Sequence, residues 1–398
     1  MQRTWKDIFK DYNTQQPIFK NKDALSDRYV PETVCHRDEQ MKHVAKIIAP
    51  AIKGDKPSNV FVYGNTGTGK SLILVYITNE MARNTDKARV LYVNCKMKRV
   101  SDTEYRLLAE LARQLGRDLP ATGLPTVEVY KTFIEALEAE GKTVILILDE
   151  IDSLVKKTGD GILYNLTRLD QDLSKSKISL IGISNDTSFA DGLDPRVKSS
   201  LSEEEIIFPP YNAAQLQDIL LQRALLAFND GVLGEGVIAK CAALAAQEHG
   251  DARKALALLR IAGELAEREN LLGITTADVD SAEDKLDLDR VVEVVKAQPK
   301  QSQAVLAAAI RLSESGQKNI QTGDVFSVYE DVCKSSGIKM LTQRRISDLI
   351  AELDMLGIIN SRVISKGRYG RTREIRILLG KNVLDKIKAS LKDSYLLG

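Results

Sequence analysis

The sequence holds few of the residues that build disulfides or metal sites. Its four cysteines form no C-x-x-C pair and its three histidines show no ligand spacing: Cys35, Cys95, Cys241, Cys333, His36, His43 and His249. A disulfide framework or a structural zinc site is therefore not expected. The metal that remains to be expected is Mg²⁺ carried in with a nucleotide.

Long apolar runs are missing as well. No stretch approaches the roughly 18 apolar residues of a membrane span, and residues 1–6, MQRTWK, lack the apolar segment of a signal peptide. With 43% hydrophobic and 28% charged residues, the chain has the composition of an ordinary soluble protein, which we expect in the cytoplasm without a membrane partner. Its 398 residues exceed one ordinary core and predict two or three domains.

The net charge of +1 hides an asymmetry along the chain. From Lys300 onward there are about 17 Lys/Arg against about 10 Asp/Glu, roughly +7, which leaves about −6 for the remainder. A basic surface for an acidic partner is therefore expected toward the C-terminal end.

What the sequence does contain is a phosphate-binding loop. Residues 64–71 read GNTGTGKS and fill every fixed position of the pattern G-x-x-x-x-G-K-[ST]. An apolar, β-branched run at 59–63 precedes the loop and a helical-looking run at 72–77 follows it, as a phosphate cradle requires. The predicted ATP/ADP-binding residues of the loop are Gly64, Asn65, Thr66, Gly67, Thr68, Gly69, Lys70 and Ser71. Lys70 is expected to reach the β- and γ-phosphates, and Ser71 to offer its hydroxyl to Mg²⁺.

Polar residues at the ends of two later strands complete a catalytic set. Asp149 and Glu150 follow the apolar run 143–148, at the strand end where parallel sheets bind ligands. Asp149 is predicted to bind Mg²⁺ and Glu150 to orient or deprotonate water. Asn185 ends the run 179–184 and could touch the γ-phosphate or the attacking water, although a turn asparagine is the alternative.

Two arginines are further candidates for the nucleotide site. Arg196 lies in a predicted loop, LDPRVK, from which a cation could stabilise the transition state on a neighbouring subunit. Arg253 begins a helix at GDARKA and could close over the phosphates. For each of them a solvent-exposed surface arginine is the alternative.

Strands that alternate with helices predict an α/β fold with an open, mostly parallel sheet. The predicted strands are 59–63, 89–94, 143–148, 179–184 and 205–208, and the predicted helices are 37–52, 101–115 and 126–140. The helix at 101–115 is expected to begin with Ser101 as N-cap and Glu104 completing a capping box. Residues 1–20 are read as an arm that docks by the aromatic residues Trp5, Phe9 and Phe19.

After Pro209 the chain becomes Ala- and Leu-rich with helical spacing. This composition and spacing predict a helical lid domain over 212–285, followed by a short linker at 287–300. Helices at 301–312, 322–335 and 342–356, strands at 357–364 and 372–378 and a closing helix from 382 predict a winged-helix domain. The expected domains are thus an arm (1–20), a nucleotide-binding α/β domain (21–210), a lid (211–290) and a winged helix (298–398).

The winged helix carries the candidate DNA-binding residues. An apolar stripe on the third helix, from Ile346 to Leu356, leaves its basic N-terminal turn free for the major groove. The strand ribbon from Arg362 to Arg376 holds six basic residues against Glu374, which suits phosphates or a minor groove. The predicted DNA contacts are Thr342, Gln343, Arg344, Arg345, Arg362, Lys366, Arg368, Tyr369, Arg371 and Arg373.

The order of these motifs resembles that of the archaeal replication initiators of the AAA+ class, which are related to eukaryotic origin-recognition and helicase-loading subunits. The resemblance rests on loop 64–71, LDEID at 148–152, SN at 184–185, DPR at 194–196, GDAR at 250–253 and the terminal winged helix. It covers nearly the whole chain from about residue 28 and implies an AAA+ P-loop ATPase sheet, a helical lid and a C-terminal winged helix.

The resemblance also implies roles and partners. Asn185 would be sensor 1, Arg196 a finger acting in trans and Arg253 sensor 2. Val30 and Arg37 would lie near the adenine, Tyr211 and Arg223 would contribute to the nucleotide pocket, and the insertion 101–137 would be a second DNA contact. The implied partners are double-stranded origin DNA, the replicative helicase and paralogous initiator subunits, which would place the protein at the nucleoid.

The leading hypothesis is an ATP-dependent replication initiator that binds origin DNA and helps recruit or load the helicase, with slow hydrolysis as a switch. One alternative is a DNA-remodelling AAA+ motor whose winged helix is only a tether. Another is a transcription regulator in which the nucleotide is purely structural. A clamp-loader subunit fits less well because such subunits do not normally end in a winged helix.

Overall fold

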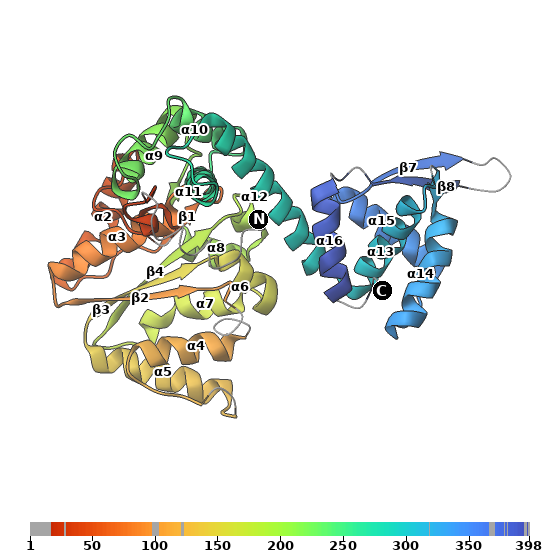
Figure 1. Cartoon of the computed structure of the whole chain (residues 1–398). Helices are drawn as coiled ribbons and strands as arrows, with labels where there is room; N and C mark the ends of the chain where they lie inside the picture. Colours follow the sequence, from red (N-terminus) through yellow and green to blue (C-terminus); the bar gives the residue numbers. More distant parts are fainter. Residues whose placement is uncertain are drawn as a thin grey trace. The chain divides into compact units, whose positions relative to one another are not determined.

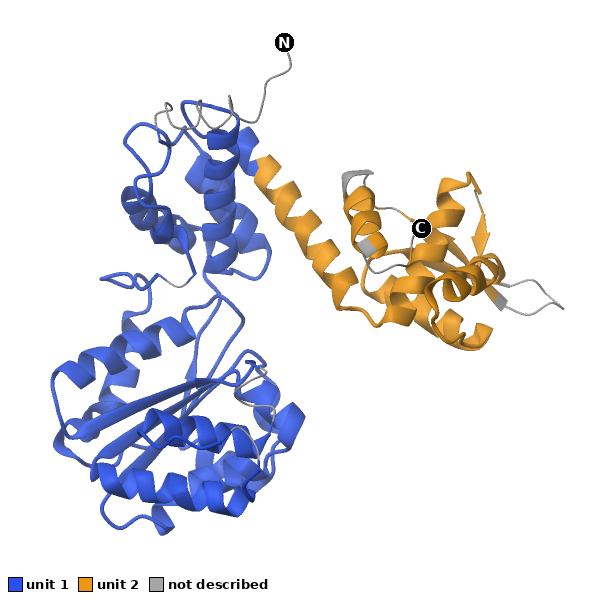
Figure 2. Ribbon diagram, turned by 60° about the horizontal axis from the view of Figure 1, so that its bottom comes forward, with its two compact units in different colours: residues 1–279 blue, residues 280–398 orange. Residues whose placement is uncertain are grey.

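The chain forms two compact units, residues 1–279 and 280–398, which Figure 2 distinguishes by colour. The description is based on a computed structural model and covers residues 17–27, 29–97, 103–120, 123–317, 319–365, 371–377, 379, 381–393 and 396. Among these residues no helix combines the length and the apolar character that crossing a membrane requires.

Five parallel strands form the centre of the first unit, in the order β2-β3-β4-β1-β5 (Figure 1). They are β1 (Val60–Tyr63), β2 (Ala88–Asn94), β3 (Thr143–Asp149), β4 (Lys177–Ser184) and β5 (Glu204–Ile207). The predicted open, parallel sheet is therefore confirmed. Because all five strands run the same way, the segments after β1, β3 and β4 meet at one edge of the sheet.

Helices cover both faces of this sheet (Figure 1). On one face, α2 (Asp38–Ile48) and α3 (Lys70–Arg83) pack on inward side chains such as Ile145 and Ile147. The other face carries α4 (Glu104–Gln114), α5 (Thr126–Glu140), α6 (Ile151–Thr158), α7 (Gly161–Thr167) and α8 (Pro195–Leu201). Successive residues of a strand point to opposite faces, so all seven residues of β3 are buried.

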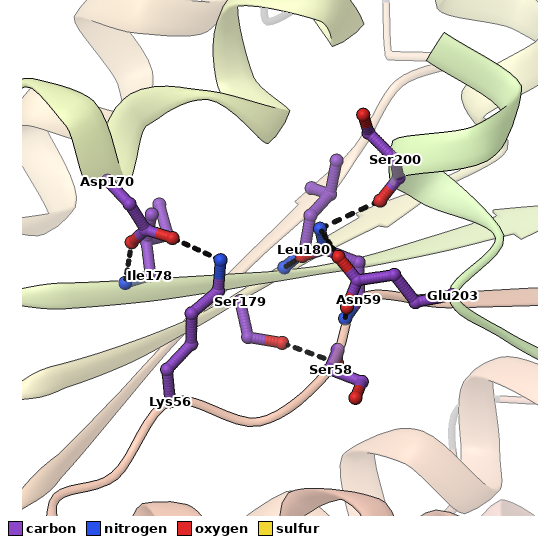
Figure 3. Close-up of polar contacts among 9 residues, drawn as sticks. All are labelled: Lys56, Ser58, Asn59, Asp170, Ile178, Ser179, Leu180, Ser200 and Glu203. Atoms are coloured by element: carbon purple, nitrogen blue, oxygen red, sulfur yellow. Dashed lines mark hydrogen bonds and ion pairs between the residues drawn. The ribbon is translucent and has the colours of Figure 1, made fainter. Parts of the chain in front are cut away.

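At the end of the sheet where the strands begin, hydrogen bonds around the buried Asn59 hold neighbouring segments together (Figure 3). The Asn59 side-chain oxygen accepts from the Leu180 amide at 2.8 Å, and its nitrogen donates to the Ser200 carbonyl at 2.8 Å. Its main-chain amide donates to the Glu203 carboxylate at 2.9 Å, and the ion pair Lys56–Asp170 lies nearby. These contacts tie the end of α8 and the start of β5 to β1 and β4, opposite the phosphate loop.

The lid consists of α9 (Ala213–Ala227), α10 (Val237–Gln247), α11 (Ala252–Arg268) and the start of α12 (Thr276–Ala297), with the short helix η1 (Lys22–Leu25) against it. Asn212 and Gln215 form a capping box at the start of α9, which fixes where the lid begins. Phe19 stacks on Phe228 with ring centres 4.9 Å apart. The predicted aromatic docking of the arm thus holds for Phe19, while Trp5 and Phe9 lie outside the described residues.

The second unit has the winged-helix arrangement. Its helices are α13 (Lys300–Glu314), α14 (Thr322–Ser336), α15 (Gln343–Met355) and α16 (Lys381–Asp393), and its strands are β6 (Ile320–Gln321), β7 (Asn360–Ser365) and β8 (Arg371–Arg376). The strands form an antiparallel sheet in the order β6-β8-β7. The apolar stripe predicted for the third helix is confirmed, since Ile346, Leu349, Ile350 and Leu353 are buried in the core of this unit.

Four local expectations were wrong. The N-cap of α4 is Thr103, whose side chain accepts from the Arg106 amide at 3.3 Å, and not Ser101. The expected linker at 287–300 is largely helical, because α12 continues to Ala297 and ends only before Gln298-Pro299. Arg196 lies in the first turn of α8 instead of a loop. The expected two-stranded ribbon has a third strand, β6, whose two residues are too short to show a periodicity.

Candidate nucleotide site

A pocket opens at the carboxyl edge of the sheet, between the phosphate loop and the lid. The predicted site residues that line it are Gly67, Thr68, Gly69, Lys70, Ser71, Asp149, Glu150, Asn185, Tyr211, Arg223 and Arg253. They come from β1–α3, β3, β4, α9 and α11, so the fold brings together residues that are nearly 190 positions apart in the chain. The loop residues Gly64, Asn65 and Thr66 do not line the pocket.

The backbone of the phosphate loop adopts conformations that favour glycine. Gly67 and Gly69 have φ values of +70° and +91°, in the left-handed region. A Cβ atom on Gly67 would stand 1.7 Å from an oxygen of Asp251, the N-cap residue of the lid helix α11. The loop and the lid are therefore in direct contact, and only a glycine fits between them.

Lys70 begins α3 and is almost fully buried. Its ammonium group donates to the carbonyl oxygens of Gly64 and Asn65, both at 2.7 Å. Burial lowers the pKa of Lys70 from 10.5 to about 8, although the neighbouring Asp149 carboxylate opposes this shift. The cation thus stands at the mouth of a helix whose N-terminal amides favour an anion.

Asp149 is the centre of a hydrogen-bond network at the end of β3. One of its oxygens, Oδ2, accepts from the hydroxyls of Ser71 and Tyr92, each at 2.6 Å. The other, Oδ1, accepts from the main-chain amide of Glu150 at 2.9 Å. The serine hydroxyl and the carboxylate predicted to share a Mg²⁺ ion are therefore adjacent, from two different elements.

These two side chains fit a magnesium ion that is bound together with a nucleotide. No group of three or more His, Cys, Asp and Glu that could hold a metal occurs among the described residues. Mg²⁺ is commonly bound through one or two carboxylates together with substrate phosphates and water. Ser71 and Asp149 would supply the protein's share of that shell.

Glu150 and Asn185 directly follow β3 and β4 and line the same pocket. Glu150 adopts a left-handed backbone with φ of +54°, a conformation that costs a non-glycine residue about 1 kcal/mol. Its carboxylate pairs with Lys96 at 3.3 Å. Asn185 follows β4 directly and lines the pocket, as expected from the position of its strand beside β1.

The lid contributes Arg253 from the first turn of α11. Asp251 caps this helix by accepting from the Arg253 amide at 2.7 Å, and the Thr66 hydroxyl donates to the same carboxylate at 3.4 Å. The Arg253 Nε lies 3.6 Å from Asp251, which holds the guanidinium at the edge of the pocket. The main-chain amide of Ala252 donates to the Gly67 carbonyl at 3.2 Å, a second link between lid and loop.

Three further predicted residues do not line the pocket. Val30 is exposed and, like Arg37, does not line the pocket, whereas its neighbours Tyr29 and Pro31 do. Arg37 is buried behind the phosphate loop. Arg196 is exposed outside the pocket, where Asp194 accepts from its Nε and Nη2 at 3.1 and 3.0 Å.

Sequence reasoning missed the residues that support the site without belonging to a motif. Tyr92 reaches Asp149 from β2, and Gln222 on α9 holds the segment before α2 by donating to Thr33. Asp251 belongs to the GDAR motif, but the motif does not predict its contact with the loop. A capping signal, an aspartate directly before a helical run, could have identified Asp251, whereas nothing in the sequence points to the other two.

Nucleotide affinity is expected to fall when Lys70 loses its proton. Because the pKa of Lys70 is about 8, the charged form that attracts phosphate predominates below that pH. Above it we expect the affinity for ATP to weaken by up to about tenfold per pH unit, while the ligand-free fold gains stability up to about pH 10.5 because its unfolded state binds more protons. Titration of a fluorescent ATP analogue between about pH 7 and pH 9.5 tests this, and a constant affinity over that range contradicts it.

In the winged helix, the residues predicted to read bases crowd the start of α15. Thr342 is the N-cap, accepting from the Arg345 amide at 3.5 Å, and Gln343, Arg344 and Arg345 are exposed. Arg345 also pairs with Glu352 at 3.4 Å. On the strands, Arg362 is exposed and Arg373 donates to the Ser361 hydroxyl at 3.2 Å. Lys366, Arg368 and Tyr369 lie outside the described residues, as does the side chain of Arg371.

The parallel sheet with its phosphate loop, the helical lid and the second unit together define a AAA+ ATPase domain with a lid and a C-terminal winged helix. Three family models match the chain in that order: an AAA domain over residues 53–185, a Cdc6 AAA+ ATPase-type lid domain over 217–284, and the CDC6 C-terminal winged helix domain over 293–386.

The chain belongs to the family of ORC1-type DNA replication proteins. It is 52% identical to ORC1-type DNA replication protein 1 of Methanosarcina acetivorans over 376 residues, covering 93% of this chain and 90% of that protein. It is 51% identical to the ORC1-type DNA replication protein of Thermococcus onnurineus over the same shares of both chains. A solved structure of the Aeropyrum pernix ORC1 protein in complex with DNA matches with a TM-score of 0.82 and 40% identity, covering 96% of this chain and all of that one.

Proposed function

We propose that this protein is a nucleotide-controlled replication initiator that binds origin duplex DNA and helps recruit or load the replicative helicase. The observation that carries the proposal is the joining of a complete phosphate-loop site to a basic winged helix in one chain. The membership in the ORC1-type family and the DNA complex of the A. pernix relative support the DNA-binding half.

The proposed roles follow the geometry of the pocket. Lys70 and the loop amides bind the phosphates of ATP or ADP, and Ser71 and Asp149 hold Mg²⁺, which screens the phosphate charge when bound. Glu150 orients the attacking water, with Asn185 beside it as sensor 1 and Arg253 closing from the lid as sensor 2. Tyr211 and Arg223 border the pocket from the lid side.

Arg196 is proposed to act in trans. It lies outside the pocket of its own chain and is exposed, so a neighbouring subunit could receive it. Asp194 holds the guanidinium through both of its oxygens, which presents the planar cation in a single orientation. Paralogous initiator subunits are the neighbours that this role would require.

The proposed contacts with DNA are the exposed residues at the start of α15 and the basic residues of the β7–β8 ribbon. The insertion with α4 and α5 is proposed as a second contact. The domains are proposed to be 1–20, 21–210, 211–290 and 298–398, and α12 runs from the lid through the segment 291–297 between the last two.

Nuclease protection of an origin duplex and of a random duplex tests the proposal. We expect the full chain with ATP to protect an origin duplex from nuclease at protein concentrations that leave a random duplex of equal length unprotected, at moderate salt. Equal protection of both duplexes at every salt concentration would contradict a role in origin recognition. Such a result would leave the nucleotide site itself untouched.

The ATP hydrolysis rates of the wild-type protein and of Glu150→Gln distinguish a nucleotide switch from a DNA-remodelling motor. The substitution keeps the shape of the side chain and its neighbours, so we expect ATP affinity within about twofold of wild type and turnover reduced by about 100-fold or more. In a switch, wild-type turnover is slow and duplex DNA hardly changes it. Rapid turnover that DNA stimulates strongly and that Glu150→Gln abolishes would favour the remodelling motor instead.

A further inference from the structure

The guanidinium of Arg37 connects the phosphate loop with the segment that leads into the lid. Arg37 precedes α2 as its N-cap residue and is only 2% exposed. Its Nε donates to the Thr68 carbonyl at 3.1 Å and its Nη2 to the Pro209 carbonyl at 2.5 Å. Its Cζ lies 3.8 Å from the centre of the Tyr211 ring. Pro209 and Tyr211 lie between the last strand of the sheet and the first lid helix.

The contacts of Arg37 require a guanidinium. Its polar and ring partners among the described residues are the carbonyl oxygens of Thr68 and Pro209, the ring of Phe208, and both the ring and the hydroxyl of Tyr211, all neutral groups. The planar guanidinium has five N–H donors, so it can donate to two carbonyl oxygens while its face stacks on an aromatic ring. An ammonium group cannot make both kinds of contact. A buried cation without a described carboxylate is costly, so its presence at this place points to a role beyond packing.

The carbonyl that Arg37 holds determines the direction of a phosphate-binding amide. The Thr68 carbonyl and the Gly69 N–H belong to one trans peptide plane and therefore point in opposite directions. Thr68 and Gly69 line the pocket and Arg37 does not, so the N–H of Gly69 points away from Arg37 and toward the pocket side. The Thr68 hydroxyl anchors the loop by donating to the Asn65 carbonyl at 2.9 Å, and Arg37 adds a contact to the peptide beside Gly69, whose φ is +91°.

The adjacent peptide is held from the lid. The Ala252 amide at the start of α11 donates to the Gly67 carbonyl at 3.2 Å, which orients the Thr68 N–H in the same manner. Two successive loop amides are thus oriented from outside the loop, one through the lid helix and one through Arg37 and the Pro209 segment.

We propose that Arg37 is a positioning residue of the nucleotide site, which keeps the Gly69 amide directed at the phosphates and couples that amide to the hinge of the lid. The inference rests on the proposed nucleotide binding and deepens it. Lid movement that shifts Pro209 would release the Thr68 carbonyl, so the position of the lid sets how well the loop binds phosphate. Phosphate bound to the Gly69 amide would in turn favour the hinge position shown here.

Two substitutions and a matched control test the proposal in the full chain. We expect Arg37→Lys to bind ATP and ADP analogues about tenfold more weakly than wild type, and Arg37→Ala about 50-fold more weakly, since each loses a buried hydrogen-bond partner of the loop. The control is Asn59→Ala, which removes another buried polar side chain that bridges main-chain groups, at the opposite edge of the sheet. We expect it to lower the Tm but to change nucleotide affinity by less than about twofold.

Chemical rescue separates positioning from a general loss of structure. Ethylguanidinium should restore most of the nucleotide affinity of Arg37→Ala, whereas ethylammonium at equal concentration should not. Arg37→Lys with wild-type affinity, or equal rescue by both compounds, would overturn the inference while wild-type binding upholds the proposed function. Failure of the wild-type chain to bind either nucleotide would contradict the proposed function and this inference with it.

Discussion

Replacing Lys70 with alanine is expected to weaken ATP and ADP binding by roughly 100- to 10,000-fold, because about two charge-assisted hydrogen bonds of about 1.5–3 kcal/mol each are lost. The buried ammonium is the cation at the start of α3, and it also holds the Gly64 and Asn65 carbonyls. Its removal therefore takes away charge and loosens the loop at once. Equilibrium titration with fluorescent nucleotide, checked by circular dichroism for folding, measures the loss.

The control for Lys70→Ala is Lys56→Ala, which removes an equal charge from the opposite edge of the sheet. Lys56 pairs there with Asp170 (Figure 3), and neither residue lines the pocket. We expect this variant to bind nucleotide like wild type. If Lys70→Ala is less stable but still occupies its DNA sites when folded, the nucleotide is purely structural and the transcription-regulator alternative gains support.

Arg344→Ala is expected to weaken binding to a specific duplex about tenfold or more, with a smaller effect on random duplex, as the loss of a base contact costs about 1–3 kcal/mol. Arg344 is exposed in the first turn of α15 and forms no ion pair with the described residues. Arg345, its neighbour, is held by Asp348 and Glu352 on the same helix. We therefore expect Arg345→Ala to lose less affinity, because its guanidinium must leave those carboxylates to reach DNA.

Anisotropy titrations on specific and random duplexes at several salt concentrations measure both variants. Lys334→Ala, on α14 of the same unit, removes an exposed cation that is paired with Asp331 and serves as the control. Equal losses on the two duplexes with a smaller salt slope would assign Arg344 to a phosphate instead of a base. No loss on either duplex would contradict the placement of α15 at the DNA.

The parts of the site and of the fold that the sequence could predict are those marked by a pattern within one continuous segment. The phosphate loop is contiguous, and Asp149 ends a strand whose residues 144–148 form an unbroken apolar run. Helix α5 was predicted with the bounds that it has, because its ends coincide with strong signals at Pro125 and Gly141. The winged helix could be recognised because its helices and strands follow one another along the chain.

The parts that could not be predicted depend on contacts between distant segments. Tyr92 and Asp149 are 57 residues apart, and Arg37 and Pro209 are 172 apart. The family resemblance implies that Arg37 lies near the adenine, but nothing in the sequence indicates that its side chain donates to the Thr68 carbonyl of the phosphate loop. The short helix α8 was taken for a loop although Asp194 and Pro195 are a typical helix start, because seven residues show too little periodicity.

Nucleotide-controlled origin binding is tested most directly by the genomic occupancy of the wild-type and Lys70→Ala proteins, mapped beside the sites where replication starts. We expect wild-type occupancy to be concentrated at those start sites, and the Lys70→Ala protein, present at equal level, to lose that concentration. Wild-type occupancy spread over promoters without enrichment at replication starts, or an unchanged map for Lys70→Ala, would contradict it.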